Sequence, residues 1–378
     1  MVKKILRAVI AWRILLQSIL LFLPLAGTIQ SAYLGGGQAL YRDTPWFWGW
    51  LNFDGEHYLS IARFGYGPLE YFFFPLYPLI MRQLASISDL IQVAALSGHV
   101  VTSVSFIVAL IGLAKLMPTR KRTSFWMFLA VFLLFPTSYY FAAIYTESLF
   151  LMAAVWCFVF IERKKFVAAA IFAAVASATR VVGVVFPLII LYEIARTNNF
   201  RLRSILSVPT MIALAIAPIG ILSYMYYLYH TTGNPLQFRE SLEIFGDQRS
   251  TRLILLPQVY YRYIFKIIPN VPISYFPALF TTWLEFIVGV VFVVLSLIAF
   301  VKLKTSYAMY SALTVFIPTL AGSFSSLPRY VLISFPLFFV ISGFVEKLPR
   351  WGKVLYFSVS VSLLVVAELM FMRGYWVS

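Results

Sequence analysis

The chain has 378 residues, of which 61% are hydrophobic and only 12% are charged. A soluble domain carries about 25% charged and about 45–50% apolar residues, so this composition excludes a single water-soluble globule. Many apolar runs approach the ~20 residues of a transmembrane helix, and the alternating ~10-residue segments of a membrane β-barrel are absent. The composition therefore predicts an all-α polytopic membrane protein.

The net charge of +16 is confined to short segments between the apolar runs. These segments hold nineteen of the thirty basic residues and only three of the fourteen acidic residues, while the other segments sum to zero. Cytoplasmic loops of membrane proteins carry such an excess of Lys and Arg, so these segments are expected in the cytoplasm and nucleic acid is not expected as a partner. The basic residues are Lys3, Lys4, Arg7, Arg13, Lys115, Arg120, Lys121, Arg122, Arg163, Lys164, Lys165, Arg196, Arg201, Arg203, Lys302, Lys304, Lys347, Arg350 and Lys353.

In chain order, the apolar runs predict about eleven transmembrane helices. Their expected ranges are 9–29, 90–115, 124–140, 147–161, 166–179, 181–195, 205–229, 276–301, 306–322, 330–346 and 354–372. The first run follows Met-Val-Lys-Lys as in a signal peptide, but it is longer than a typical signal core and is expected to stay as the first helix. With a cytoplasmic N-terminus, this path leaves the C-terminus outside. No repeat or linker divides the chain, so residues 1–378 are expected to form one domain.

Two outer segments, 30–89 and 230–275, are too long to be turns. The first contains an aromatic stretch from Tyr71 to Tyr77, and the second contains an amphipathic piece around Tyr260–Lys266. Aromatic and amphipathic segments of this kind lie at the membrane–water interface. We therefore expect interfacial helices in these outer segments, the first above all.

Polar residues of four separate segments are expected at this same outer face. They are Asp54, Glu56, His57 and Tyr58 in the first outer segment, Tyr145 and Glu147 before the fourth helix, Arg180 before the sixth, and Arg329 and Tyr330 at the start of the tenth. Each carboxylate also has a plain structural reading. Asp54 could form a turn with Gly55, Glu56 could be a solvated loop residue, and Glu147 could favour the positive end of its helix dipole.

Arg180 and Arg329 are harder to explain structurally. Each is expected at the N-terminal end of an inward-running helix, where the dipole disfavours a cation. An anion bound between them would remove this conflict, because helix N-termini and arginine both suit phosphate. The alternative is that each arginine pairs with Glu147 or Asp54.

A disulfide and a cysteine metal site are excluded because Cys157 is the only cysteine. The three histidines, His57, His99 and His230, are too scattered to predict a metal site. Glu285 and Glu368 lie in or near expected spans and receive no role.

Taken together, several motifs resemble those of the PIG-V family, which comprises GPI mannosyltransferase II and its prokaryotic relatives. The matching segments are Phe53-Asp54-Gly55-Glu56-His57-Tyr58, Phe73-Phe74-Pro75-Leu76-Tyr77-Pro78, Tyr145-Thr146-Glu147-Ser148, Ala178-Thr179-Arg180 and Pro328-Arg329-Tyr330. They follow the family's order and spread over most of the chain. Phe53 is a departure, since the family usually has Trp before the Asp.

The resemblance implies a GT-C fold and a membrane glycosyltransferase. Such an enzyme transfers a hexose, typically mannose, from a polyprenyl- or dolichyl-phosphate donor to a glycan or glycolipid acceptor on the extracytoplasmic side, with inversion. The family's acidic residue in the first loop carries over to Asp54 as the base, and Gly55 is expected to let the backbone turn tightly around it. Arg180 and Arg329 would bind the donor phosphate. Glu56, His57, Tyr58, Tyr145, Glu147 and Tyr330 would support the site or contact substrate.

No cofactor or metal is expected, since the lipid-phosphate sugar is a co-substrate. The short loops favour a prokaryotic plasma membrane, with the endoplasmic reticulum membrane as the alternative. The rival function is a multispan lipid or sugar transporter or flippase, which would place its ionisable residues near the bilayer midplane.

Overall fold

The computed structural model describes residues 1–30, 33–117, 122–201, 207–241 and 253–377, with residues 122–124 described by their backbone only. Every regular element in these ranges is helical, and the ranges contain no strand. The predicted all-α class is therefore confirmed for the part of the chain that the structure describes.

The elements of the N-terminal half are given first. They are α1 (Val2–Ile19), η1 (Leu20–Leu25), α2 (Gly37–Asp43), α3 (Pro45–Trp48), η2 (Gly49–Leu51), α4 (Asp54–Phe64), α5 (Leu76–Ala85), α6 (Ile91–Leu116), α7 (Arg122–Leu133), η3 (Ser138–Phe141), α8 (Glu147–Glu162) and α9 (Phe166–Thr179). The C-terminal half contains η4 (Val181–Val185), α10 (Phe186–Thr197), α12 (Val208–Ile216), α13 (Ile219–Thr232), α14 (Gln237–Glu240), α15 (Leu256–Arg262), the π-helical turn η6 (Tyr263–Ile267), η7 (Ile268–Asn270), α16 (Phe276–Lys302), α17 (Thr305–Thr319), α18 (Leu327–Tyr330), η8 (Val331–Ile333), α19 (Phe335–Lys347) and α20 (Arg350–Met372).

Four helical segments of the described residues are long and apolar enough to cross a membrane: Val2–Leu25, α6, α16 and α20. They have 23 to 27 residues each, which at 1.5 Å per residue exceeds the ~30 Å hydrocarbon core. Two bent pairs raise the number to six if each pair is one span. They are α12 with α13, bent by 46°, and the segment Leu327–Ile333 with α19, bent by 90°.

Every expected span coincides with helix, but several bounds were wrong. The first helix begins at Val2, because Lys3, Lys4 and Arg7 remain exposed at its start and need no place in an apolar environment. The expected span 124–140 ends early at Leu133, before a turn and the short segment η3. Residue 205, the expected start of the seventh span, lies outside the described residues, as do residues 242–252 of the second outer segment.

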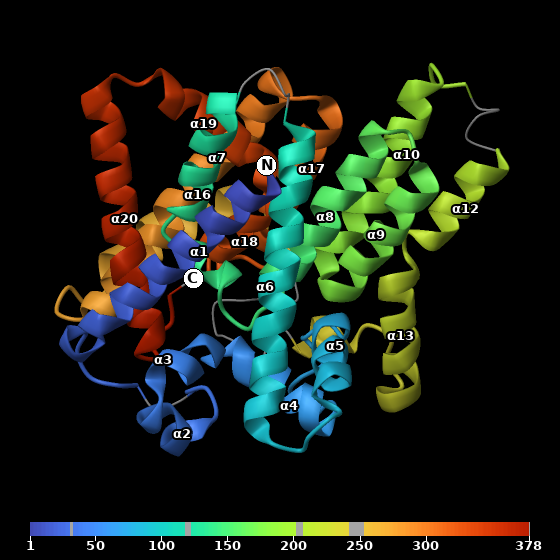
Figure 1. The fold of residues 1–378 in the computed structure, drawn as a ribbon. Coiled ribbons are helices and arrows are strands. Elements are labelled where there is room, and N and C mark those ends of the chain that lie inside the picture. The colour runs from blue at the N-terminus through green and yellow to red at the C-terminus, as the bar shows by residue number, and fades with distance from the viewer. Residues whose placement is uncertain (31–32, 118–121, 202–206, 242–252, 378) are drawn as a thin grey trace.

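The short helices α2 to α5 of the first outer segment form a layer at one end of the molecule (Figure 1). The helix α6 begins in this layer and runs to the opposite end. Helix formation in the first outer segment agrees with the sequence prediction, and the second outer segment also contains helix around Tyr260–Lys266, in α15 and η6.

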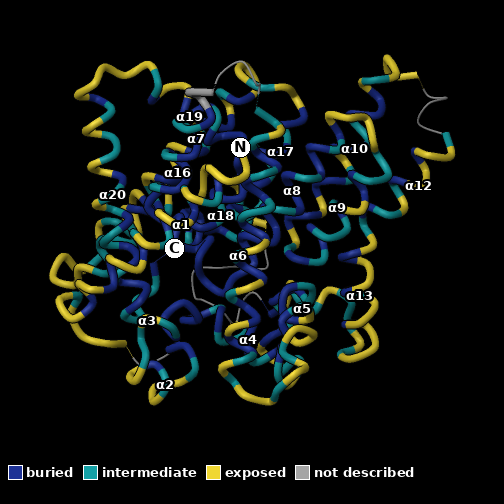
Figure 2. Tube along the Cα trace, in the orientation of Figure 1, coloured by how far each residue is buried: buried dark blue, intermediate teal, exposed yellow. Residues whose placement is uncertain are grey.

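The core is centred on α8, which is buried along most of its length (Figure 2). Its neighbour α9 presents small residues, Ala169, Ala170, Ala173 and Ala176, all of them fully buried. Small side chains let membrane helices approach closely. The contact between α9 and α13 is an example, because a Cβ on Gly220 of α13 would lie 2.1 Å from the carbonyl oxygen of Ala174.

Candidate active site

The backbone turns sharply just before Asp54. Phe53 has φ 60° and ψ −115°, a region that non-glycine residues rarely adopt, and Asp54 then begins α4. Backbone strain of this kind costs on the order of 1–3 kcal/mol and persists where the surroundings fix it. The expected tight turn therefore exists, but at Phe53 rather than Gly55, which lies inside α4 with ordinary backbone angles.

Asn52 connects this turn to distant parts of the chain through hydrogen bonds. Its side-chain amide donates to the carbonyl of Phe371 at 2.9 Å, and its side-chain oxygen accepts from the backbone N–H of Gly35 at 2.9 Å. Its own carbonyl accepts a 2.7 Å hydrogen bond from the hydroxyl of Tyr145. Asn52 is fully buried, so these bonds hold the start of α4 without competition from water.

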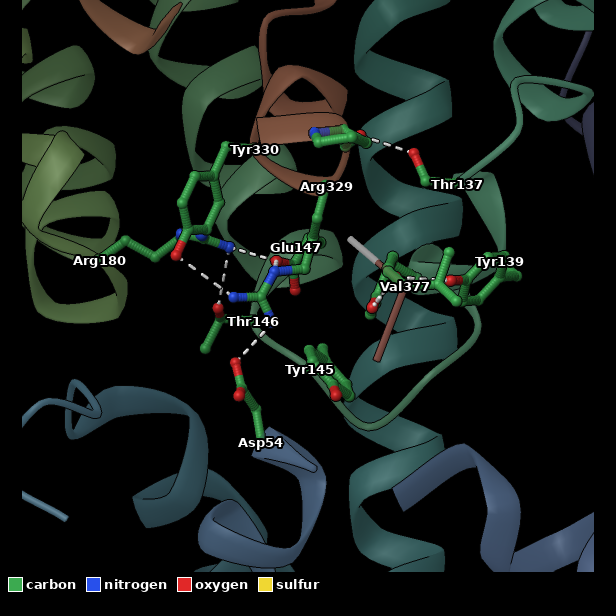
Figure 3. A network of polar contacts seen from close by, with 12 residues as sticks. Asp54, Thr137, Tyr139, Tyr145, Thr146, Glu147, Arg180, Arg329, Tyr330 and Val377 are labelled. Atoms are coloured by element: carbon green, nitrogen blue, oxygen red, sulfur yellow. Dashed lines mark hydrogen bonds and ion pairs between the residues drawn. The ribbon is translucent and has the colours of Figure 1, made fainter. Parts of the chain in front are cut away.

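The carboxylates of Asp54 and Glu147 form one network with the guanidinium groups of Arg180 and Arg329 (Figure 3). Arg329 donates from Nη1 to Oδ2 of Asp54 at 2.5 Å, and Arg180 donates from Nη1 to Oε1 of Glu147 at 2.5 Å. The same Oε1 lies 3.5 Å from Nε of Arg329, so Glu147 connects the two pairs. The side chains of Glu147 and Arg329 are 1% and 3% exposed, and those of Arg180 and Asp54 are 13% and 17% exposed.

Each arginine pairs with a protein carboxylate, as the second interpretation of the sequence expects. The four formal charges cancel, as a buried cluster requires. Arg180 and Asp54 are the two members that keep accessible surface. Among the described residues, no side chain or backbone group hydrogen-bonds the second oxygen of Asp54.

Aromatic rings surround the guanidinium group of Arg329. Its Cζ lies 5.1 to 5.7 Å from the ring centroids of Tyr140, Tyr145, Tyr330 and Trp376. The ring of Tyr330 also lies 4.9 Å from Cζ of Arg180. Attraction between a cation and an aromatic face strengthens when water is excluded, so the rings help to hold both arginines in place.

A pocket of about 430 Å³ opens at this network. Six of the nine expected site residues line it: Asp54, Tyr58, Glu147, Arg180, Arg329 and Tyr330. The remaining wall is largely apolar or aromatic, with Phe72, Phe73, Phe74, Val181, Val182, Leu253, Ile317 and Leu320 among its residues. The polar groups thus converge at one part of a mostly apolar pocket, as in small-molecule sites generally.

Glu56, His57 and Tyr145 do not line this pocket. The side chain of Glu56 lies on a different side of α4 from Asp54, and its Oε1 accepts a hydrogen bond from the backbone N–H of Gly36. Burial raises the pKa of Glu56 above its ordinary value, and the bond from Gly36 opposes the rise. On the same helix, Asp54 and Tyr58 share the pocket-facing side because they are four residues apart.

His57 stacks on the ring of Phe73, with centroids 4.7 Å apart, and its Nδ1 lies 3.6 Å from a carboxylate oxygen of Glu70. Tyr145 is buried behind the network. Its ring packs beside Arg329 and its hydroxyl binds Asn52, so its role in this geometry is to support the site.

Sequence reasoning missed Arg239 and Trp376. Arg239 lies in α14 and lines the pocket, but in the sequence it is one of several charged residues of the second outer segment. Trp376 reaches the site because the segment after α20 folds back into the core. There the carbonyl of Val377 accepts hydrogen bonds from Tyr139 and Tyr140 at 3.0 and 2.7 Å. No local sequence pattern signals such a return.

The described residues contain no group of three His, Cys, Asp or Glu side chains that could hold a metal ion. No protein-family model, curated protein or solved structure matches this chain.

Proposed function

We propose that the chain is a membrane glycosyltransferase that transfers a hexose, in the first instance mannose, from a polyprenyl- or dolichyl-phosphate sugar to a glycan or glycolipid acceptor. One observation carries the proposal. A carboxylate with an accessible oxygen, Asp54, lies beside two arginines in a pocket whose remaining wall is largely apolar or aromatic. A lipid-linked phosphosugar has matching parts, namely an isoprenoid chain, an anionic phosphate and a sugar. The motifs that resemble the PIG-V family supply the same residues.

In the proposed reaction, Asp54 accepts the proton of the attacking acceptor hydroxyl. The hydroxyl oxygen forms a bond to the anomeric carbon, and the bond from that carbon to the phosphate oxygen breaks on the opposite face. The configuration therefore inverts, and the leaving lipid phosphate gains one negative charge. A positioned base contributes typically 10²–10⁴-fold to such a step.

Arg180 is the proposed partner of that leaving phosphate. Its side chain keeps 13% exposure at the pocket wall, while Arg329 is nearly inaccessible and orients Asp54. Charge that develops in the transition state is stabilised best by groups already fixed in place. The bond from Arg180 to Glu147 and the ring of Tyr330 give it that fixed position.

The proposed architecture is a GT-C fold with eleven crossings, a cytoplasmic N-terminus and the pocket on the extracytoplasmic side. Besides the four long helices, shorter ones such as α8, α9 and α17 would complete the crossings inside the bundle, where neighbouring helices surround them. The proposed location is a prokaryotic plasma membrane. The distribution of the +16 charge supports the orientation.

The bent segment that carries Arg329 favours the transporter alternative, since transporters place their binding sites at broken helices. One experiment separates the two functions. Purified protein in detergent is mixed with polyprenyl-phosphate [³H]mannose and a membrane glycolipid extract, and labelled product is extracted and counted. An enzyme forms labelled glycolipid in detergent, whereas a transporter needs a sealed membrane and leaves the donor intact. Absence of product with every acceptor, together with transport of the donor in vesicles, would replace the proposal.

A further inference from the structure

A second cavity lies at the other end of α8 from the candidate active site. Glu147 begins α8 at the active site, and Glu162 ends it at the second cavity, about 22 Å along the helix. The volume of this cavity is about 460 Å³. The ends of α6, α8 and α16, the start of α17 and Phe339 of α19 border it, so four separate segments of the chain meet there.

Four cations line this space, which we call the basic cavity: Lys115, Arg163, Lys302 and Lys304. The single carboxylate in its lining, Glu162, accepts two hydrogen bonds from Nζ of Lys304, at 2.7 and 2.6 Å. That pair is neutral. No described residue forms an ion pair or hydrogen bond with the side chain of Lys115, Arg163 or Lys302, although the ammonium of Lys115 lies 5.2 Å from the ring centroid of Trp156. Among the described residues, three positive charges of the basic cavity therefore have no carboxylate partner.

The rest of the lining is apolar or aromatic. Leu116, Val159, Leu303 and Phe339 contribute to the wall, and Tyr307, which is 8% exposed, adds a buried phenol. Directly before Lys302, the side chains of Phe300 and Val301 are 50% and 83% exposed on the apolar helix α16. An apolar outer surface thus meets a cationic cavity at the end of a membrane-length helix.

We propose that the basic cavity binds the phosphate headgroup of an anionic phospholipid from the cytoplasmic leaflet. The three free cations attract the phosphate, and the exposed apolar surface of α16 accommodates acyl chain. Basic pockets between helices on the cytoplasmic side suit such headgroups, and each Lys or Arg near an anionic membrane surface adds to the attraction. The assignment to the cytoplasmic leaflet rests on the proposed orientation. The binding itself depends neither on that orientation nor on the proposed reaction.

A simpler explanation exists for each cation. Lys115 and Lys302 lie in the last turns of α6 and α16, where they complement the helix dipoles, and all cytoplasmic loops are basic. The turn between α19 and α20 provides a matched comparison. Lys347 lies in the last turn of α19, and Arg350 and Lys353 follow at the start of α20, but none of the three lines the basic cavity.

The test compares two triple variants of equal charge change in detergent micelles. The cavity variant is Lys115→Gln/Arg163→Gln/Lys302→Gln, and the control variant is Lys347→Gln/Arg350→Gln/Lys353→Gln. Tm is measured after addition of phosphatidylglycerol, phosphatidylcholine or inorganic phosphate. We expect phosphatidylglycerol to raise the Tm of the wild type and the control variant above the values in phosphatidylcholine. This difference should be lost in the cavity variant.

If both triple variants lost the phosphatidylglycerol-dependent rise in Tm equally, the lipid would be attracted to surface charge in general, and the proposal would be overturned. An equal rise with inorganic phosphate alone would overturn the lipid assignment, because a soluble phosphate would then suffice. If the triple variant does not fold, Arg163→Gln replaces it, since this exposed side chain contacts no described residue through a hydrogen bond or ion pair. Native mass spectrometry then counts bound phosphatidylglycerol, and retention at the wild-type number would contradict the proposal.

Discussion

Asp54 and Glu56 are two residues apart on α4 but have different surroundings. Asp54 faces the pocket with one oxygen free, whereas Glu56 binds the backbone of Gly36 and does not line the pocket. We therefore expect Asp54→Asn to lower the turnover of sugar transfer by at least roughly 10²-fold, because the amide cannot accept the proton. Glu56→Gln is the matched control and should keep most of the activity. The measurement is the initial rate at saturating donor. If Glu56→Gln lost more activity than Asp54→Asn, the base would be Glu56.

The two arginines differ in the number of carboxylates whose charge they compensate. Arg329 pairs with the carboxylate of Asp54 and lies 3.5 Å from that of Glu147, while Glu147 is the one carboxylate among the described residues with which Arg180 pairs. Removing one partner of a buried ion pair leaves an uncompensated charge and costs about 3–5 kcal/mol. We expect Arg329→Gln to lower the Tm of the donor-free protein more than Arg180→Gln does.

In both variants the decrease in Tm should become smaller if the carboxylate that has lost its arginine partner is also neutralised. Asp54→Asn added to Arg329→Gln should therefore restore part of the Tm, and a double-mutant cycle measures the coupling. Equal Tm values for the two single variants would show that the contacts with Asp54 contribute little to folding. Donor-dependent stabilisation, measured separately, should be lost in Arg180→Gln.

The sequence predicted which charged residues come together in the site but not which of them form ion pairs with each other. Asp54, Glu147, Arg180 and Arg329 could be brought together because a charge-based topology places all four at one membrane face. Which arginine pairs with which carboxylate could not be predicted, because it depends on the positive-φ backbone of Phe53 and on a bend of 90° after Ile333. Neither follows from apolar periodicity.

At the scale of elements, the segment after α20 supports the site from behind. The ring of Trp376 lies 5.0 Å from that of Phe53 and 5.7 Å from Cζ of Arg329, so it packs beside the residue that precedes Asp54 and beside the ion-pair partner of Asp54. We expect Trp376→Leu to lower turnover by up to roughly 10²-fold through misplacement of Asp54. KM for the donor should change much less, because Trp376 does not line the pocket.

Trp376→Phe keeps an aromatic ring and should restore most of the turnover. The matched control is Trp351→Leu, whose side chain is 71% exposed at the start of α20, the opposite end of this helix from Trp376. A proportional loss of turnover in both leucine variants, or failure of Trp376→Phe to rescue, would mean that Trp376 has only a general packing role.

Helix existence was predictable because each apolar run is bounded by charged or turn residues. Helix continuity was not. The expected span 330–346 is interrupted at Ser334, directly before the α19 sequence Phe335-Pro336, and proline at the second helical position begins a new helix rather than extending the old one. The expected span 124–140 stops at Leu133 because Pro136 follows within three residues and disfavours helix in the residue before it.

For the whole molecule, the direction of insertion is the property that charge alone predicts. Exposed side chains at the two ends allow a test that does not disturb the core: Ile87 is 85% exposed between α5 and α6, and Trp351 is 71% exposed at the start of α20. Cys157 is fully buried, so a Cys157→Ser background removes the one native thiol of the chain with little change in packing.

In that background we expect Ile87→Cys to react with an impermeant maleimide in intact cells, and Trp351→Cys to react only after the membrane is made permeable. The reason is that Ile87 directly follows α5, the last helix of the layer that also contains Asp54, whereas Trp351 lies among the basic residues that the positive-inside rule retains in the cytoplasm. Labelling of Trp351→Cys alone in intact cells would reverse the orientation. The pocket would then face the cytoplasm, where nucleotide sugars are available as donors, and only the apolar part of the pocket wall would favour a lipid-phosphate donor.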